Sequence, residues 1–173
     1  FKLIKKLIPR VQKIGVVYNP GEPNSAIIIN IAREVAKSLG LKLIEATANR
    51  TSEVRAAAAS LVSKIDVMYL TTDNTTAAAI DVINDVCNES NIPFVSSERE
   101  SLKSGTLAFL GIDYYERGRE AGNIAVRILK GEKPGNIAIS YPKKFDLAVN
   151  KKVADKFGIT IPADILKIAE IIE

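Results

Sequence analysis

Short polar side chains are concentrated at four places in this sequence, each directly after an apolar, β-branched run. Amides and hydroxyls at such places can hydrogen-bond a small polar ligand, and carboxylates can pair with a cation. Binding is therefore the chemistry that these residue types suggest. The ten candidate ligand-binding residues are Asn19, Glu22, Asn24, Ser25, Asp73, Asn74, Ser96, Ser97, Asp113 and Tyr114.

The same residues also have a purely structural interpretation. Ser25, Thr75 and Asp113 suit helix N-caps, and capping by itself explains such residues more often than not. The stretch "NPGEPNS" also suits a tight turn. Capping does not require all the other polar residues at once, however, so the four clusters together favour a binding site. The polar residues left over by capping are Asn19, Glu22, Asp73 and Asn74.

Strands and helices alternate along the whole chain in the apolar pattern. This alternation predicts an α/β fold with a doubly wound, mainly parallel sheet, helices on both faces and flavodoxin-like strand order. In such sheets, ligands bind outside the carboxyl ends of the strands, where all four clusters fall. The predicted strands cover 13–19, 41–47, 65–72, 92–97 and 105–112, with one or two more within 137–150. The predicted helices cover 1–9, 25–39, 51–64, 75–90, 98–103, 113–130, 150–158 and a segment after Pro162.

Composition excludes several classes of function. The net charge of +4 comes from 24 basic and 20 acidic residues, and the basic residues are scattered, so we expect no nucleic-acid partner. The chain has one cysteine, Cys87, and no histidine, so we expect no disulfide, no metal site and no cofactor. No stretch is long and apolar enough to span a membrane, and no signal peptide is visible. The sequence opens on Phe1 within a helical pattern, which suggests a piece of a longer protein.

The sequence lacks the usual enzyme motifs. No glycine-rich phosphate loop follows the first strand, and no G-x-S-x-G nucleophile elbow is present. A response regulator needs a phosphorylatable aspartate at the end of the third strand, and Asp73 lies too late for that role. We therefore predict that the protein is not an enzyme.

Several stretches resemble a known family. "VVYNPGEPNS", "DVMYLTTDN", "IPFVSSE" and "GTLAFLGIDYYERGREAGNIAVRILKGEKP" are similar to the periplasmic substrate-binding proteins of ABC importers in the tryptophan/tyrosine-binding group. Their fold is the type I periplasmic-binding fold, in which two α/β lobes close on a ligand. The resemblance covers nearly the whole chain, and the first and last of these stretches are the most specific.

The resemblance implies that 1–173 is one α/β lobe, the second of two. Segment 108–131 would then cross over to pack on the first lobe. The ligand would be an aromatic or aliphatic amino acid, delivered from the interlobe cleft to an ABC permease. The full-length protein would be periplasmic or extracellular and anchored as a lipoprotein. In a fragment without the first lobe, segment 108–131 is expected either to fold back on its own lobe or to bury against a second copy, by self-association or by exchange of the segment.

In the resemblance, eight of the ten candidates match three ligand-facing loops, and Asp113 with Tyr114 matches the crossing segment. The N-terminus of the helix at Ser25 suits a carboxylate, and Asp113 or Asp73 suits an ammonium. Two alternatives remain open at this point. One is a ligand-sensing domain of a transcriptional repressor with the same fold, and the other is a nucleotide-binding α/β enzyme domain. The residues that precede Phe1 in the gene would distinguish an importer component from a repressor.

Overall fold

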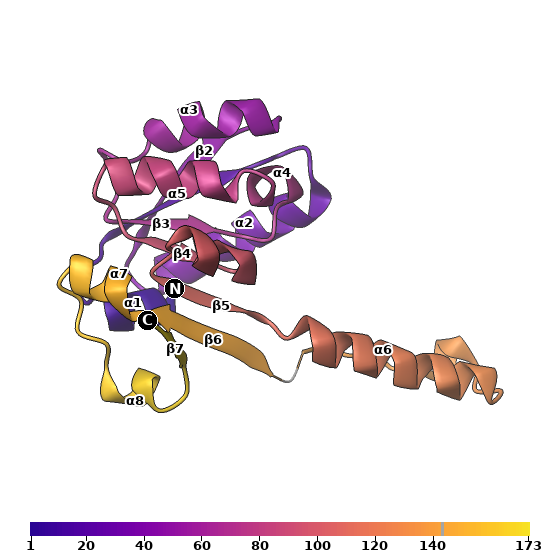
Figure 1. The fold of residues 1–173 in the computed structure, drawn as a ribbon. Coiled ribbons are helices and arrows are strands. Elements are labelled where there is room, and N and C mark those ends of the chain that lie inside the picture. The colour runs from indigo at the N-terminus through magenta and orange to yellow at the C-terminus, as the bar shows by residue number, and fades with distance from the viewer. Residues whose placement is uncertain (143) are drawn as a thin grey trace.

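A computed structural model describes residues 1–142 and 144–173, and its centre is one seven-stranded sheet (Figure 1). The strand order is β2-β1-β3-β4-β5-β6-β7. The first five strands pair in parallel, β6 runs antiparallel to β5, and β7 runs parallel to β6. The predicted mainly parallel sheet with flavodoxin-like order is therefore confirmed. The strands are β1 (Lys13–Tyr18), β2 (Lys42–Thr47), β3 (Val67–Leu70), β4 (Phe94–Ser96), β5 (Ala108–Ile112), β6 (Phe145–Asn150) and β7 (Glu170–Ile172).

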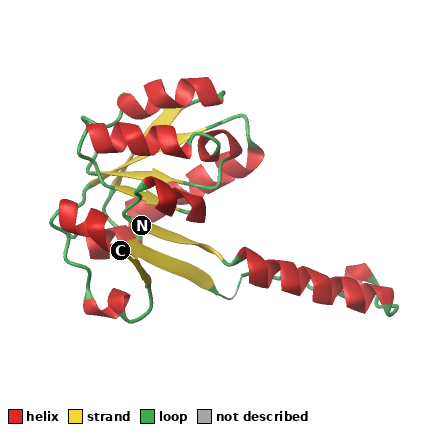
Figure 2. Ribbon diagram, in the orientation of Figure 1, coloured by secondary structure: helices red, strands yellow, loops and turns green. Residues whose placement is uncertain are grey.

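Helices cover both faces of the sheet (Figure 2). Apolar residues of α1, α2, α7 and α8 pack with the strands in one core cluster, and those of α3 and α5 pack in another. The α-helices are α1 (Lys2–Leu7), α2 (Pro23–Ser38), α3 (Val54–Ala59), α4 (Asn74–Ala77), α5 (Ile80–Glu89), α6 (Tyr114–Leu129), α7 (Lys151–Lys156) and α8 (Ala163–Leu166). Short 3-10 helices are η1 (Thr51–Glu53), η2 (Arg99–Ser104) and η3 (Pro134–Asn136).

Local sequence signals set several helix ends. Gly40 follows α2 with φ of +69°, and Gly131 follows α6 with φ of +98°, a backbone region that favours glycine. Asn150 is the N-cap of α7, where its Oδ1 accepts a hydrogen bond from the Val153 amide at 3.1 Å. These three boundaries agree with the prediction from sequence because each depends on a residue type acting within one helical turn.

Three predicted elements differ in the structure. The helix predicted over 75–90 is divided into α4 and α5, because Ala79 leaves the helical region with φ of −116°. The helix predicted over 51–64 ends at Ala59. The segment 137–150, predicted to hold one or two strands, has one among its described residues, β6, and so agrees with the prediction. The last residues form β7 instead of helix, since Val149 and Asn150 of β6 pair with Ile171 and Ile172.

Helix α6 projects from the rest of the molecule as an arm that leaves after β5 (Figure 1). None of its residues is buried, and the exposed fraction of the Leu129 side chain near its far end is 86%. The arm therefore does not fold back on its own lobe, which removes one of the two outcomes expected from sequence. No helix within residues 1–142 and 144–173 is long and apolar enough to cross a membrane.

Candidate functional site

Glu22 holds the loops after β1 and β3 together. Its carboxylate accepts hydrogen bonds from the backbone amides of Asn74 and Thr75, both at 3.0 Å. It also accepts from Asn74 Nδ2 and Thr75 Oγ1, both at 2.7 Å. These bonds, the Thr75 hydroxyl foremost, lower the pKa of Glu22 from 4.5 to about 2. Glu22 thus satisfies the free amides at the start of α4.

Asp73 has a structural role at the same place. It is buried, and its carboxylate accepts from the Asn19 amide at 2.7 Å and from the Thr76 amide at 2.8 Å. Asn19 in turn donates from Nδ2 to Thr75 Oγ1 at 2.8 Å. The structure therefore brings four of the ten candidates into one hydrogen-bonded network, and internal partners occupy its two carboxylates. The four are Asn19, Glu22, Asp73 and Asn74.

Two buried hydroxyls beside this network lack partners. Ser25 Oγ, in the first turn of α2, and Thr71 Oγ1, after β3, have no hydrogen-bond partner among the described residues. An unsatisfied buried polar group costs about 1–3 kcal/mol. Hydrogen bonding is thus least complete where α2 meets the end of β3, and the Asn24 side chain bridges the two by donating to the Thr72 carbonyl at 2.9 Å.

The two serines after β4 have different roles. Ser96 is buried, and its Oγ accepts from the Glu98 amide at 2.9 Å, which shapes the turn into η2. Ser97 is partly exposed, and its hydroxyl lies 2.8 Å from the hydroxyl of Tyr69 on β3. Burial raises the pKa of the Tyr69 phenol, so it stays protonated at neutral pH.

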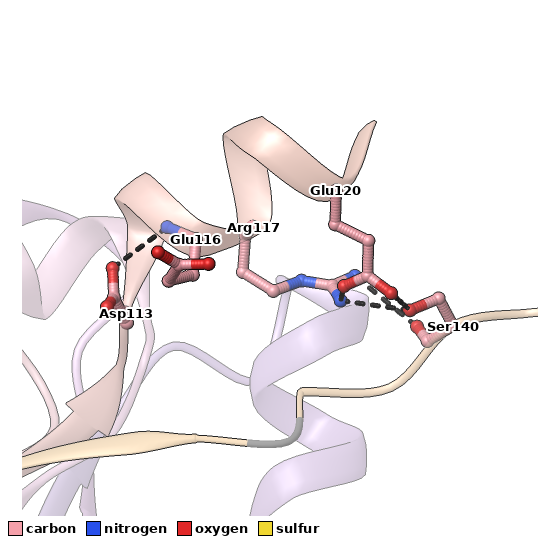
Figure 3. Close-up of polar contacts among 5 residues, drawn as sticks. All are labelled: Asp113, Glu116, Arg117, Glu120 and Ser140. Atoms are coloured by element: carbon pink, nitrogen blue, oxygen red, sulfur yellow. Dashed lines mark hydrogen bonds and ion pairs between the residues drawn. The ribbon is translucent and has the colours of Figure 1, made fainter. Parts of the chain in front are cut away.

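Asp113 and Tyr114 lie at the start of the arm, and no hydrogen bond in the described structure joins them to the Glu22 network. Asp113 is the N-cap of α6, and its carboxylate accepts from the Glu116 amide at 3.0 Å (Figure 3). The Tyr114 side chain is 68% exposed. The capping role that the sequence suggested for Asp113 is therefore present.

A second group of polar contacts holds Ser140, in the segment that follows α6, against that helix (Figure 3). Arg117 pairs with Glu120 at 2.6 Å and donates to the hydroxyl and the carbonyl of Ser140, each at 3.3 Å. The Ser140 hydroxyl also hydrogen-bonds Glu120. A hollow of about 310 Å³ opens beside these residues, lined by charged side chains of both signs. Because Arg117 pairs with Glu120 and Arg119 with Glu116, this cluster fastens the arm more readily than it binds a ligand.

A groove of about 250 Å³ lies at the carboxyl ends of β3, β4 and β5. Ser97 and Tyr114 are the two of the ten candidates that line it. Thr71 and Thr72 directly follow β3. Asp73 was selected as a polar residue after this strand, and the same criterion could have selected both threonines. Phe145 could not be found in this way, because it begins the antiparallel strand that pairs with Ile112. The groove is lined by Ile28, Tyr69, Thr71, Thr72, Ser97, Leu110, Gly111, Ile112, Tyr114 and Phe145.

The groove combines apolar walls with a few hydroxyls, which is the usual composition of a small-molecule site. Among the described residues, no group of three or more histidine, cysteine or acidic side chains is placed to hold a metal. The arrangement offers van der Waals contact, aromatic stacking on Tyr114 and hydrogen bonds from Ser97 and its neighbours. Its chemistry is that of recognition.

Comparison with known proteins identifies the family. The family model described as ABC transporter substrate binding protein matches residues 1–172. The chain belongs to this family. A curated relative, the tyrosine-binding protein of Clostridioides difficile (strain R20291), is 38% identical over 150 residues, which are 87% of this chain and 44% of that protein.

Two solved structures are similar over almost all of the chain. One is a conserved domain protein from Vibrio cholerae O1 biovar eltor, with a TM-score of 0.91 and 37% identity over 99% of this chain and 58% of that one. The other is the ABC domain in complex with L-Trp from Streptococcus pneumonia, with a TM-score of 0.90 and 30% identity over the same shares. The chain thus spans about half the length of these relatives.

Proposed function

We propose that this chain is the second lobe of a two-lobe solute-binding protein of an ABC importer. The complete protein captures an aromatic amino acid between its lobes and delivers it to a membrane permease. It works in the periplasm or outside the cell, held at the membrane by a lipid anchor. This lobe contributes binding groups to the cleft and catalyses no reaction.

The groove at the strand ends is the observation that carries this proposal. Its apolar walls suit an aromatic side chain, and Tyr114 at its rim offers a ring for stacking. The unpartnered Thr71 hydroxyl on its wall, with the Tyr69–Ser97 pair, supplies polar groups close by. The relatives support the ligand class, since one is named a tyrosine-binding protein and another was solved with L-Trp.

The arm supports the two-lobe arrangement. In the proposed protein, segment 108–131 crosses to the first lobe, and the exposed apolar side chains of α6 and its return pack there. These side chains include Val126, Leu129, Ile139 and Tyr141, which are 48%, 86%, 81% and 73% exposed. Isolated apolar side chains on a surface are ordinary, but a projecting helix with no buried residue lacks the packing that normally stabilises helices.

Calorimetric titration of the full-length protein with the common amino acids tests the proposal. We expect L-tyrosine or L-tryptophan to bind, and the 173-residue chain alone to bind the same ligand far more weakly, because half of the cleft is then missing. Glucose and ATP serve as controls. Tight binding of either control with no response to any amino acid would reject the ligand class. Equal affinity of the fragment and the full-length protein would reject the two-lobe cleft.

A further inference from the structure

Glu98 stands out among the acidic side chains at the ligand-facing edge of the sheet. The carboxylates of Glu22 and Asp73 accept the backbone and side-chain hydrogen bonds described above. Asp113 caps α6, and Asp146 at the start of β6 lies 3.8 Å from Arg99. Each of these four carboxylates therefore has an internal partner that already stabilises its negative charge.

The carboxylate of Glu98 has no such partner. Within residues 1–142 and 144–173, no hydrogen bond or ion pair reaches it, although the residue is partly buried. The adjacent Arg99 does not neutralise it, because the Arg99 guanidinium pairs with Glu170 and Asp146 on the neighbouring strands. A partly buried carboxylate without a countercharge loses solvation and gains nothing in exchange.

The backbone around Glu98 is fixed. Its amide donates to Ser96 Oγ at 2.9 Å, and its carbonyl accepts from Ser101 Oγ at 2.6 Å. These bonds hold Glu98 at the start of η2, directly after Ser97, whose side chain lines the groove. An unpaired charge on a rigid turn is suited to recognition, because little further ordering is needed when a partner arrives.

Glu98 directly follows Ser97, which forms a hydroxyl pair with Tyr69. Burial is the main cause of the raised pKa of Tyr69, and the negative charge of Glu98 raises it further. Desolvation likewise raises the pKa of Glu98 itself, as expected for a carboxylate without a cationic neighbour. Tyr69 and Ser97 both line the groove, and their hydroxyls lie 2.8 Å apart. Glu98 is not itself a lining residue, but it directly follows Ser97, and its charge acts on the Tyr69 phenol.

We infer that Glu98 is the residue of this lobe that binds the ammonium group of the ligand, with the Tyr69–Ser97 hydroxyl pair beside it. The inference rests on the proposed function and changes one part of the prediction from sequence, which gave this role to Asp113 or Asp73. An ammonium ion supplies the missing countercharge and donates up to three hydrogen bonds, which a carboxylate and neighbouring hydroxyls can accept.

The test compares ligands with and without the ammonium group. Full-length protein and its Glu98→Gln variant are titrated with L-tyrosine and L-tryptophan, and then with 3-(4-hydroxyphenyl)propionate and 3-indolepropionate, which lack the amino group. We expect Glu98→Gln to weaken binding of the amino acid roughly 10- to 100-fold, because a charge-assisted hydrogen bond is lost. Affinity for the deaminated acids should stay the same or rise, since the variant removes a negative charge near them.

Glu100→Gln is the matched control. Glu100 lies two residues away, is exposed and pairs with Lys103 at 2.6 Å, so its substitution should leave affinity unchanged. Glu98→Asp keeps the charge and should retain more affinity than Glu98→Gln. Thermal melts of all three variants confirm that they fold.

The outcomes separate the two proposals. Amino-acid binding that Glu98→Gln leaves unchanged, or an equal loss of affinity for the amino acid and its deaminated analogue, overturns the role of Glu98 and leaves the proposed function intact. Failure of the unaltered protein to bind any amino acid overturns the proposed function and the role of Glu98 with it.

Discussion

Glu22 and Asp73 show what a residue type alone leaves undetermined. Both are acidic and follow buried strands, so both are reasonable candidates for contacting a ligand. Each, however, accepts a hydrogen bond from a residue more than fifty positions away along the chain: Glu22 from Thr75, and Asp73 from Asn19. Whether a carboxylate is free to bind depends on which loops meet in space, and composition and spacing do not contain that information.

Glu22→Gln should destabilise the protein while leaving its fold intact. A neutral amide side chain accepts hydrogen bonds from the α4 amides more weakly than a carboxylate does, and this partly exposed site favours a modest loss of about 1–2 kcal/mol. Urea unfolding at pH 7 measures the loss. Glu34→Gln, on an exposed position of α2, is the control and should change little.

The effect of Glu22→Gln should also depend on pH. The folded protein lowers the pKa of Glu22 to about 2 from 4.5, so its stabilising effect is complete above pH 4.5. As the pH falls from 4.5 towards 2, Glu22 becomes protonated in both states, and the stability advantage over the variant disappears. Thermal melts of both proteins at pH 7, 4 and 2.5 measure the difference. A difference that stays constant down to pH 2.5 would contradict the assigned role.

At the scale of elements, the sequence predicted the central sheet well, because each of β1–β5 is a short apolar run bounded by turn residues. The end of the chain was harder. The segment "KIAEIIE" has apolar residues at helical spacing, yet its last part forms β7 because the edge of β6 is available to pair with it. That edge is available because β6 pairs antiparallel with β5. This pairing joins residues far apart in the sequence, so the local apolar pattern does not predict it.

Gly111 lies in β5 and lines the groove, and this position should not tolerate a side chain. A Cβ at this position would lie 2.4 Å from Phe109 Cε2 and 2.7 Å from the Ser97 carbonyl oxygen, so the β4 turn or the Phe109 ring must move. We expect Gly111→Ala to cost about 1–3 kcal/mol of stability and to weaken ligand binding, since Ser97 lines the groove.

Gly118→Ala supplies the contrasting control for Gly111→Ala. Gly118 lies on α6 with nothing within 4 Å of an added Cβ, so alanine there should stabilise the helix by about 0.5–1 kcal/mol. Urea unfolding of both variants gives the comparison. Equal effects at the two positions would show that the close approach of Gly111 to Ser97 does not constrain the fold.

At the scale of the whole molecule, the main question is what the exposed apolar side chains of the arm pack against. The sequence predicted a long helix over 113–130, and α6 confirms its bounds to within a residue. What the helix packs against is not encoded in its own pattern, because an apolar stripe predicts burial without naming the partner. The body of the lobe does not bury it, which leaves another lobe or another copy of the chain.

The 173-residue chain expressed alone should therefore self-associate through its arm. Because α6 does not fold back, its exposed apolar side chains can leave water only against a second molecule, by docking or by exchange of segment 108–131. Size-exclusion chromatography with light scattering should detect a dimer whose population rises with concentration. Leu129→Glu, at the 86% exposed end of the stripe, should shift the equilibrium to monomer by placing a charge in the contact. Leu166→Glu, on α8 and 49% exposed, should leave the dimer unchanged. A strict monomer at high concentration, or equal effects of the two substitutions, would contradict association through the arm.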